Sequence, residues 1–311
     1  MSKPEYVSVK ATNAGRMIRG LKHETHLKVR LAGERVHLKV LPHPSSRLVF
    51  VFHGAVARDR KRIPQFADVF GVDATVVGVA DPTLNLAPDL SVGWYAGHQG
   101  YPAQTHLTEL FLEIQQALCA TRPVFVGGSS GGFAALYFSH RIEGSVAVAV
   151  NPQTSIDRYM ARWRQHYIGT CWPNLEDRQL SDVVVSDLCS LYAQSFSNSI
   201  VYLQNCADFA HVRDHMAPFI ASLPTKLLRR VALRVGFWGI TGHSASIPKS
   251  AWTPWVRAAL HAKTATLVEM LKYPDLEAQS LAAAAPPVAP GLDPDDCRYA
   301  RQLVAWLNSG A

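Results

Sequence analysis

Two serines lie between two glycine pairs in the stretch 124–140, which reads VFVGGSSGGFAALYFSH. A serine hydroxyl is a weak nucleophile, so a catalytic serine needs a base, a group that orients the base and donors for an oxyanion. A sharp turn between a buried strand and a helix can present such a serine, provided that small residues stand two positions before and after it. An apolar run precedes this turn and a helix-like segment follows it. The stretch therefore predicts a serine nucleophile on a strand–turn–helix.

The spacing G-x-S-x-G fits either serine of this turn. Gly127 and Gly131 flank Ser129, and the same pattern moved by one residue centres on Ser130, so spacing alone leaves both open. A glycine-rich turn can instead bind a phosphate at a helix N-terminus. However, no Walker lysine and no GxGxxG motif accompany this turn, and neither a nearby lysine nor a magnesium-binding aspartate on the adjacent strand is evident. Nucleophilic chemistry is therefore the favoured interpretation.

Short, nearly continuous apolar runs lie on both sides of this turn, as is typical of strands buried on both faces of a parallel sheet. These runs are 48–52, 74–80, 123–126, 145–150, 199–204 and about 229–238. Helix-like segments alternate with them at about 61–70, 104–120, 131–141, 214–223 and 251–272. Residues 25–31 and 35–41 alternate apolar and polar side chains, which predicts an N-terminal antiparallel hairpin. The whole pattern predicts an α/β fold with a mostly parallel central sheet and helices on both faces.

Residues 155–195 interrupt this alternation, because they carry aromatic and polar residues without a strand-like run. We predict that they form a helical insertion, or lid, over the sheet. The predicted organisation is one domain over 1–280 that includes this insertion, a Pro/Ala linker over 281–293 and a C-terminal helix over 294–311.

The composition of the 311 residues is that of a globular protein, with 48% hydrophobic and 18% charged residues. The net charge is +7, but we expect no nucleic-acid partner because no basic pattern of a known binding motif appears. The five cysteines lack metal-site spacing, so we expect reduced thiols, no metal and a cytoplasmic protein. We also expect no cofactor. Without a long apolar run or an apolar leader, we also expect no membrane span and no secretory signal.

Over about 48–260 the chain resembles the α/β-hydrolase superfamily. The run GGSSGGFAAL is similar to the family's turn around the nucleophile, which implies that Ser129 attacks and that the backbone N–H of Ser130 donates to the oxyanion. The family takes a second donor from a loop that often begins His-Gly. Here FVFHGAV fits, so the resemblance implies that Ala55 or Val56 offers this N–H, with Ala55 preferred, behind His53 and Gly54.

The family places an acid and then a histidine after the nucleophile along the chain. This order implies that Asp208, four residues beyond the run 199–204, is the acid, and that His243 in the loop after the last strand is the base. His211 and His215 are competing bases. Asp214 is expected to cap the next helix. In the implied mechanism His243 takes the serine proton while Asp208 orients and stabilises the imidazole.

Two segments are expected to line the substrate site at the carboxyl edge of the sheet. The loop 81–101 carries Trp94 and Tyr95, which we expect to be exposed together with Tyr101, and the segment 151–159 brings Asn151 and Gln153. His53 and Gly54 complete the predicted substrate-binding set.

GGSSGGFAAL together with NPQT is also similar, faintly, to α/β-hydrolases associated with glycan modification. The predicted function is a serine carboxylesterase acting on a small-molecule or carbohydrate acyl ester. An acyltransferase with the same triad and a non-catalytic binding or secretion partner remain the alternatives.

Overall fold

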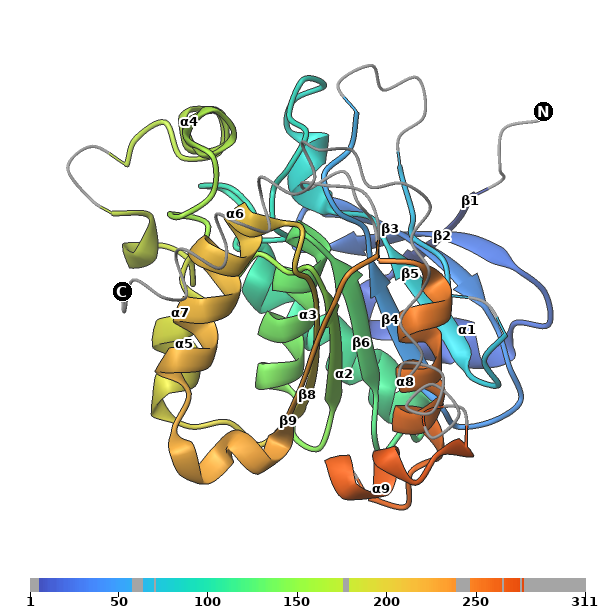
Figure 1. The fold of residues 1–311 in the computed structure, drawn as a ribbon. Coiled ribbons are helices and arrows are strands. Elements are labelled where there is room, and N and C mark those ends of the chain that lie inside the picture. Colours follow the sequence, from blue (N-terminus) through green and yellow to red (C-terminus); the bar gives the residue numbers. More distant parts are fainter. Residues whose placement is uncertain are drawn as a thin grey trace, which may run out of the picture.

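A computed structural model describes residues 6–57, 64–69, 71–175, 179–238, 247–264, 266–274 and 276. Nine strands within these residues form one sheet in the order β1-β2-β3-β5-β4-β6-β7-β8-β9 (Figure 1). The strands are β1 (Tyr6–Lys10), β2 (Thr25–Leu31), β3 (Glu34–Leu41), β4 (Leu48–Phe52), β5 (Thr75–Val79), β6 (Val124–Gly128), β7 (Val146–Val150), β8 (Ser199–Asn205) and β9 (Val231–Gly236). Strand β3 runs antiparallel to its neighbours β2 and β5, and the remaining pairs are parallel. The predicted mostly parallel α/β sheet is confirmed.

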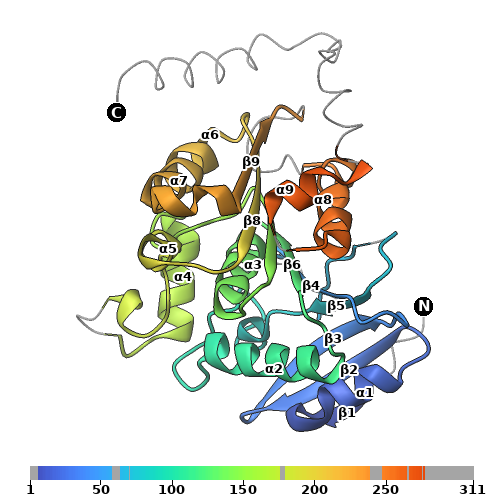
Figure 2. The same ribbon diagram turned by 90° about the horizontal axis from the view of Figure 1, so that it is seen from below.

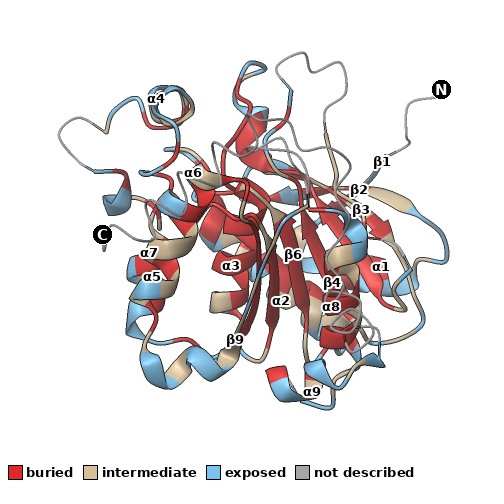
Figure 3. Cartoon of the chain, in the orientation of Figure 1, coloured by how far each residue is buried: buried red, intermediate tan, exposed pale blue. Residues whose placement is uncertain are grey.

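The apolar runs of the sequence correspond to the central strands. Every residue of β4, β5 and β8 is buried, and Figure 3 shows the same for the middle of the sheet. The predicted hairpin is β2–β3, in which Leu31 pairs with Glu34 across Ala32 and Gly33. Both of these turn residues have a positive φ, which the tight two-residue turn of a hairpin requires. The parallel edge strand β1 and the helix that follows it, α1 (Ala14–Gly20), are additions that the sequence did not indicate.

Alternate side chains of the strands build one hydrophobic core on each face of the sheet. Phe50, Phe52 and Phe125 belong to the core that α2, α3, α5 and α7 cover, whereas Val51 and Val126 belong to the core under α8 and α9 (Figure 2). These helices are α2 (Ala103–Ala117), α3 (Ser130–Arg141), α5 (Leu188–Gln194), α7 (Ala217–Ser222), α8 (Lys249–His261) and α9 (Leu267–Leu271). Helices on both faces hold the carboxyl ends of the parallel strands at one edge.

The helix expected at about 61–70 is wrong over residues 64–69, which are not helical. Their side chains reach across the sheet instead. The Phe66 ring lies 5.4 Å from the His26 ring on β2, and the Asp68 carboxylate accepts a 3.0 Å hydrogen bond from Lys39 Nζ on β3. Contacts two residues apart on the same surface are typical of an extended chain. The other residues of that expected helix lie outside the described residues.

The insertion between β7 and β8 contains α4 (Ala161–Cys171) and α5, as predicted for a helical segment. It is fastened to the loop 81–101 and to α2. Tyr167 Oη donates to the carbonyl of Gly97 at 3.1 Å, and the Gln104 amide exchanges two 2.9 Å hydrogen bonds with the backbone of Val185. Of the predicted linker 281–293 and helix 294–311, every residue lies outside the described residues.

None of the helices in the described part of the chain is long and apolar enough to cross a membrane. Within the same residues, no group of three or more histidine, cysteine and acidic side chains is arranged to hold a metal ion. The four cysteines that the structure describes, Cys119, Cys171, Cys189 and Cys206, are free thiols.

Candidate active site

Ser129 is the single residue between β6 and α3, and its backbone is in an unusual conformation, with φ 56° and ψ −122°. The glycines around it show which of the two registers the turn uses. A β-carbon at Gly127 would overlap the carbonyl of Gly131, and one at Gly131 would lie 2.5 Å from the carbonyl oxygen of Phe52. A β-carbon at Gly128 would meet only an ordinary 3.4 Å contact. A β-carbon at Gly132 would also be crowded, 2.6 Å from Pro152 Cβ. The pair in which both glycines are required is therefore the pair that flanks Ser129, while Ser130 begins α3.

The Ser129 hydroxyl is held by a side-chain amide. Gln153 Nε2 donates to Ser129 Oγ at 2.9 Å, and the Gln153 N–H donates to the Ser129 carbonyl at 3.0 Å. Gln153 is fully buried, and its Oε1 accepts from the indole N–H of Trp94. Tyr159, the last residue of the segment 151–159, also hydrogen-bonds the Gln153 side chain. The serine, the amide and the two aromatic residues form one connected group.

The loop after β4 lies directly against this turn. A β-carbon at Gly54 would be 3.3 Å from the Gly128 carbonyl oxygen and 3.4 Å from Ser129 Cβ. Val56 N–H already donates to the Ser91 carbonyl at 2.9 Å. Ala55 is exposed, and its N–H donates to none of the described residues. Of the two donors that the loop could offer, Ala55 is the one that is available, next to the N-terminus of α3.

A buried network fixes the shape of this loop. His53 Nδ1 lies 2.6 Å from the Gly54 carbonyl oxygen, while His53 Nε2 accepts from the Asp81 N–H at 3.1 Å. The ring is therefore neutral, with its proton on Nδ1. The Asp81 carboxylate accepts from the N–H groups of Thr83 and Tyr95, both at 3.0 Å, and burial raises its pKa. His53 is part of the framework behind the loop.

Asp208 lies beyond the end of β8 and is almost completely buried. It caps the short helix α6 (Phe209–His211), since its Oδ1 accepts from His211 N–H at 3.3 Å, while Oδ2 lies 3.2 Å from His211 Nδ1. Asp214, which was expected to be the cap, lies inside the following turn (Val212–Met216), so that expectation is wrong. The first helical turn begins earlier than the sequence suggested because the Asp208 side chain starts it.

The ends of β7 and β8 are tied together next to Asp208. Asn151, with φ 42°, accepts a 2.7 Å hydrogen bond from Asn205 N–H at its Oδ1. Further along the same segment, Thr154 N–H donates to His215 Nδ1 at 3.2 Å, which makes Nδ1 the acceptor and places a proton on Nε2. The Tyr159 ring lies 6.4 Å from the His211 ring and 6.3 Å from the His215 ring. Tyr159 thus lies between the Gln153–Ser129 pair and the histidines near Asp208.

No protein-family model matches the sequence, and no curated protein sequence matches it. Solved structures do match it at low identity. Prolyl oligopeptidase B from Galerina marginata superposes with a TM-score of 0.51 and 13% identity, over 79% of this chain and 38% of that one. The sheet order, the strand–turn–helix at Ser129 and this superposition agree. The chain has the α/β-hydrolase fold.

Two further similar structures have TM-scores slightly below one half. Pyrococcus horikoshii acylaminoacyl peptidase has a TM-score of 0.49 at 14% identity, over 90% of this chain and 45% of that one. The capsule O-acetyltransferase of Neisseria meningitidis serogroup A has a TM-score of 0.48 at 13% identity, over 67% of this chain and 87% of that one.

Within the α/β-hydrolase fold, the structure brings Ser129, Gln153 and Trp94 into one hydrogen-bonded group and sets Gly54 against the same turn. His243, the expected base, lies outside the described residues.

The expected exposure of the three aromatic residues is wrong. Trp94, Tyr95 and Tyr101 are each 1% exposed. Hydrogen bonds to the polar atoms of these side chains allow their burial. Tyr95 Oη, for example, donates to the Val79 carbonyl at 2.9 Å and accepts from His53 N–H at 2.9 Å.

Two residues of the site were missed by the sequence reasoning. Asp81 stands directly before Pro82 and two residues before Thr83, which is the signature of a helix cap, and could have been found from that signal. Tyr159 carries no such signal, because its role depends on the fold of the insertion.

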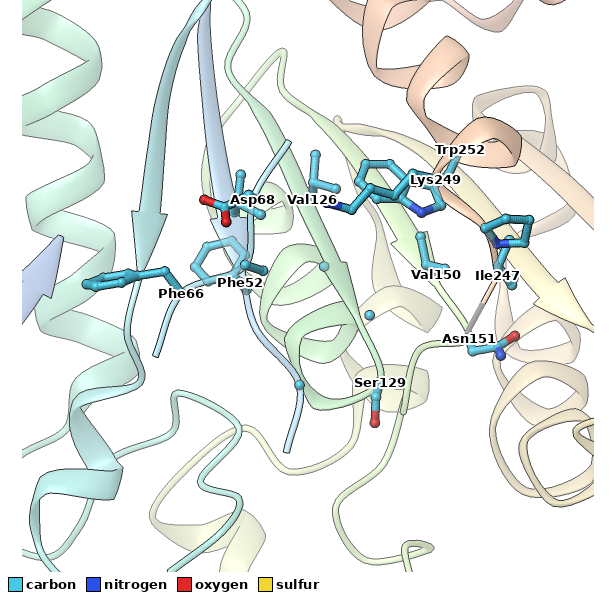
Figure 4. A pocket seen from close by; sticks show the side chains of 16 residues that line it. Phe52, Phe66, Asp68, Val126, Ser129, Val150, Asn151, Ile247, Lys249 and Trp252 are labelled. Atoms are coloured by element: carbon cyan, nitrogen blue, oxygen red, sulfur yellow. The ribbon is translucent and has the colours of Figure 1, made fainter. Parts of the chain in front are cut away.

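A cavity of about 570 Å³ lies on the face of the sheet that carries α8. Its walls include Phe66, Val126, Val150 and Trp252, and Ser129 also lines it (Figure 4). In this view the Ser129 hydroxyl points away from these four side chains. The hydroxyl contacts Gln153, which is not among the residues that line the cavity.

Proposed function

We propose that this protein is a serine hydrolase of carboxylic acyl esters in which Ser129 forms an acyl-enzyme. The observation that carries the proposal is the conformation of Ser129, a non-glycine residue with φ 56° at the strand–helix turn. Strained backbone of this kind costs about 1–3 kcal/mol and is concentrated at functional sites. A merely structural turn flanked by glycines would place one of those glycines in this position.

The proposed chemistry uses Asp208 and His243 with Ser129. His243 takes the hydroxyl proton, Ser129 Oγ attacks the acyl carbon, and the backbone N–H groups of Ala55 and Ser130 receive the oxyanion. His243 then protonates the leaving alcohol, and water releases the acid. Support for this base comes from connectivity: β9 pairs with β8, and the segment that contains His243 follows β9 while Asp208 follows β8.

His211 is the second candidate base, because its Nδ1 lies 3.2 Å from Asp208 Oδ2. The two residues are only three positions apart, however, and the same contact follows from the capping of α6 by Asp208. A base of a triad has to reach both the acid and the serine, so we retain His243 as the proposed base.

The nature of the alcohol stays open in this proposal. A carbohydrate ester was expected from the similarity of GGSSGGFAAL and NPQT to hydrolases associated with glycan modification, and the burial of Trp94 and Tyr95 means that these rings are not exposed to bind a sugar. Transfer of the acyl group to an acceptor other than water needs the same residues and differs in how water is excluded. Asn151 is tied to Asn205, so its oxygen serves the framework in this structure.

Labelling with a fluorophosphonate tests the proposal, because such probes react with an activated serine. We expect labelling of the wild-type chain, loss of labelling in Ser129→Ala, and retained labelling in Ser130→Ala, whose backbone N–H remains. A wild-type chain that is not labelled would favour a non-catalytic binding protein with this fold. Labelling that is lost in Ser130→Ala and kept in Ser129→Ala would show that the other serine attacks.

A further inference from the structure

We propose that Gln153 is a catalytic residue whose amide donates to the nucleophile, and that Trp94 and Tyr159 position it. The inference rests on the proposed function of Ser129. A glutamine in this position would otherwise be expected to bind substrate or simply to fill the core. The contacts of its two amide atoms distinguish these roles.

The orientation of the amide follows from the chemistry of its partner. The indole nitrogen of Trp94 can only donate, so the atom of Gln153 that it contacts must be the oxygen Oε1. The amino group Nε2 is then the atom that lies 2.9 Å from Ser129 Oγ, and it can only donate. The direction of the Gln153–Ser129 hydrogen bond is thereby fixed.

This direction determines where the serine proton can go. Because Ser129 Oγ accepts from Gln153, the single proton of the hydroxyl is not used in that contact, and in the proposed mechanism the base removes it. When the base removes this proton, the oxygen gains negative charge and the hydrogen bond from Nε2 becomes stronger. The donor therefore favours removal of the hydroxyl proton by the base, and it holds the oxygen in one place while the bond to the acyl carbon forms.

The surroundings make the donor rigid. Gln153 is fully buried, and Trp94 is 1% exposed with its ring 5.8 Å from the Tyr159 ring. Burial raises the pKa of Tyr159, the hydrogen bond with Gln153 lowers it, and the nearby Asp208 carboxylate raises it. The pKa is raised on balance, so Tyr159 stays protonated next to the amide. An amide that is held from two sides cannot rotate freely to present its oxygen to the serine.

Substituting the donor atom tests the inference. Gln153→Glu keeps the shape and keeps an acceptor for the Trp94 N–H, but it removes the donor to Ser129. A hydrogen bond to a charged group contributes enough that its loss reduces a rate by about 10–10²-fold. We expect the rate of fluorophosphonate labelling of the full chain at pH 8 to fall by about 10-fold or more relative to wild type. Because a protonated carboxyl can donate again, this deficit should narrow at pH 6.

A second variant and a matched control separate this effect from damage to the fold. Gln153→Met removes the donor without adding a charge, so its deficit should be similar and independent of pH. Gln104→Glu introduces a carboxyl at another buried glutamine, on α2, whose amide binds the backbone of Val185. It should label at the wild-type rate while circular dichroism shows all variants to be folded.

The possible results distinguish the two proposals. Unlabelled wild-type protein would contradict the proposed function of Ser129. Labelled wild-type protein with unchanged rates in both Gln153 variants would overturn the role of Gln153 and leave that function intact. A deficit in Gln153→Glu that is the same at pH 6 and pH 8, or one that Gln104→Glu shares, would also overturn the donor role.

Discussion

Gly131 approaches the end of β4 so closely that a β-carbon on it would lie 2.5 Å from the carbonyl oxygen of Phe52 and 2.6 Å from that of His53. Both neighbours are backbone atoms, so neither can move away as the end of a side chain could. This contact presses the first turn of α3 against the loop that carries Ala55. It links the nucleophile turn to the proposed oxyanion donor.

Gly131→Ala should therefore destabilise the protein by about 1–3 kcal/mol, the usual cost of overpacking, as measured by urea unfolding. Gly169→Ala is the matched control, because Gly169 is an exposed residue of α4 at which a β-carbon would meet no neighbouring atom within 4 Å. It should gain about 0.5–1 kcal/mol, since alanine is the better helix former. Equal effects of the two substitutions would contradict the close packing at Gly131.

Replacing each histidine separately should identify the base. His243→Ala should lower the rate of ester hydrolysis by about 10³-fold or more, because a triad without its base loses most of its rate enhancement. His211→Ala should retain most of the activity and lose some stability through the turn at Asp208. If His211→Ala instead abolishes hydrolysis and His243→Ala does not, the triad is Ser129, His211 and Asp208.

Trp94→Phe should lower the rate of Ser129 labelling by about 10-fold, because the Gln153 amide loses the indole N–H that fixes its orientation. With an ester substrate, kcat should fall while KM stays close to its wild-type value. Trp172→Phe is the control, since its indole N–H donates to Tyr167 Oη at 3.0 Å within the insertion. A similar loss in both variants would point to general loosening of the aromatic cluster.

His37 should make the protein less stable at acidic pH. Burial, together with Lys28 and Arg35, lowers the pKa of His37 from 6.5 to about 4. The unfolded chain therefore binds a proton below pH 6.5 that the folded chain does not bind until about pH 4, so stability falls as the pH falls through this window. With solvent screening of a half-buried group, the loss should be at most about 2 kcal/mol.

The free energy of unfolding of wild type and His37→Gln, measured in urea between pH 4 and 8, checks this expectation. The variant should be less sensitive to pH below 6.5, and the two curves should run parallel above it. Curves that stay parallel down to pH 4 would contradict a lowered pKa.

The sequence predicts the sheet well because a strand that is buried on both faces is a continuous run of apolar residues. A run such as residues 48–52 is apolar at every position, and β4 is buried at every position. It predicts the turn at Ser129 as well, since only glycine fits at the positions two before and two after this serine. The prediction of a helix fails at residues 64–69 because their mixture of apolar and polar residues fits the periodicity of a helix and that of a strand. The contacts of Phe66 and Asp68 with β2 and β3 favour the extended conformation.

The partners of Ser129 are only partly predictable, because they come from segments that meet in the folded state alone. The sequence indicates Gln153 as a site residue, but the direction of its hydrogen bond depends on Trp94, which is 59 positions earlier in the chain. Trp94 itself resembles an exposed loop residue, since nothing local indicates that the insertion covers it. Tyr159 lies in the segment 151–159 that was expected to line the site, but nothing local indicates its contact with Gln153.

Of the described non-glycine residues, six have a positive φ, and four of these, Trp94, Tyr95, Ser129 and Asn151, surround the candidate site. Such residues cost about 1–3 kcal/mol each, and the packed framework around them must supply that free energy. The backbone strain that lowers the stability of the protein is therefore concentrated at the site. Stabilising substitutions should be sought away from it, and a more thermostable variant obtained by relaxing these four residues would be expected to be less active.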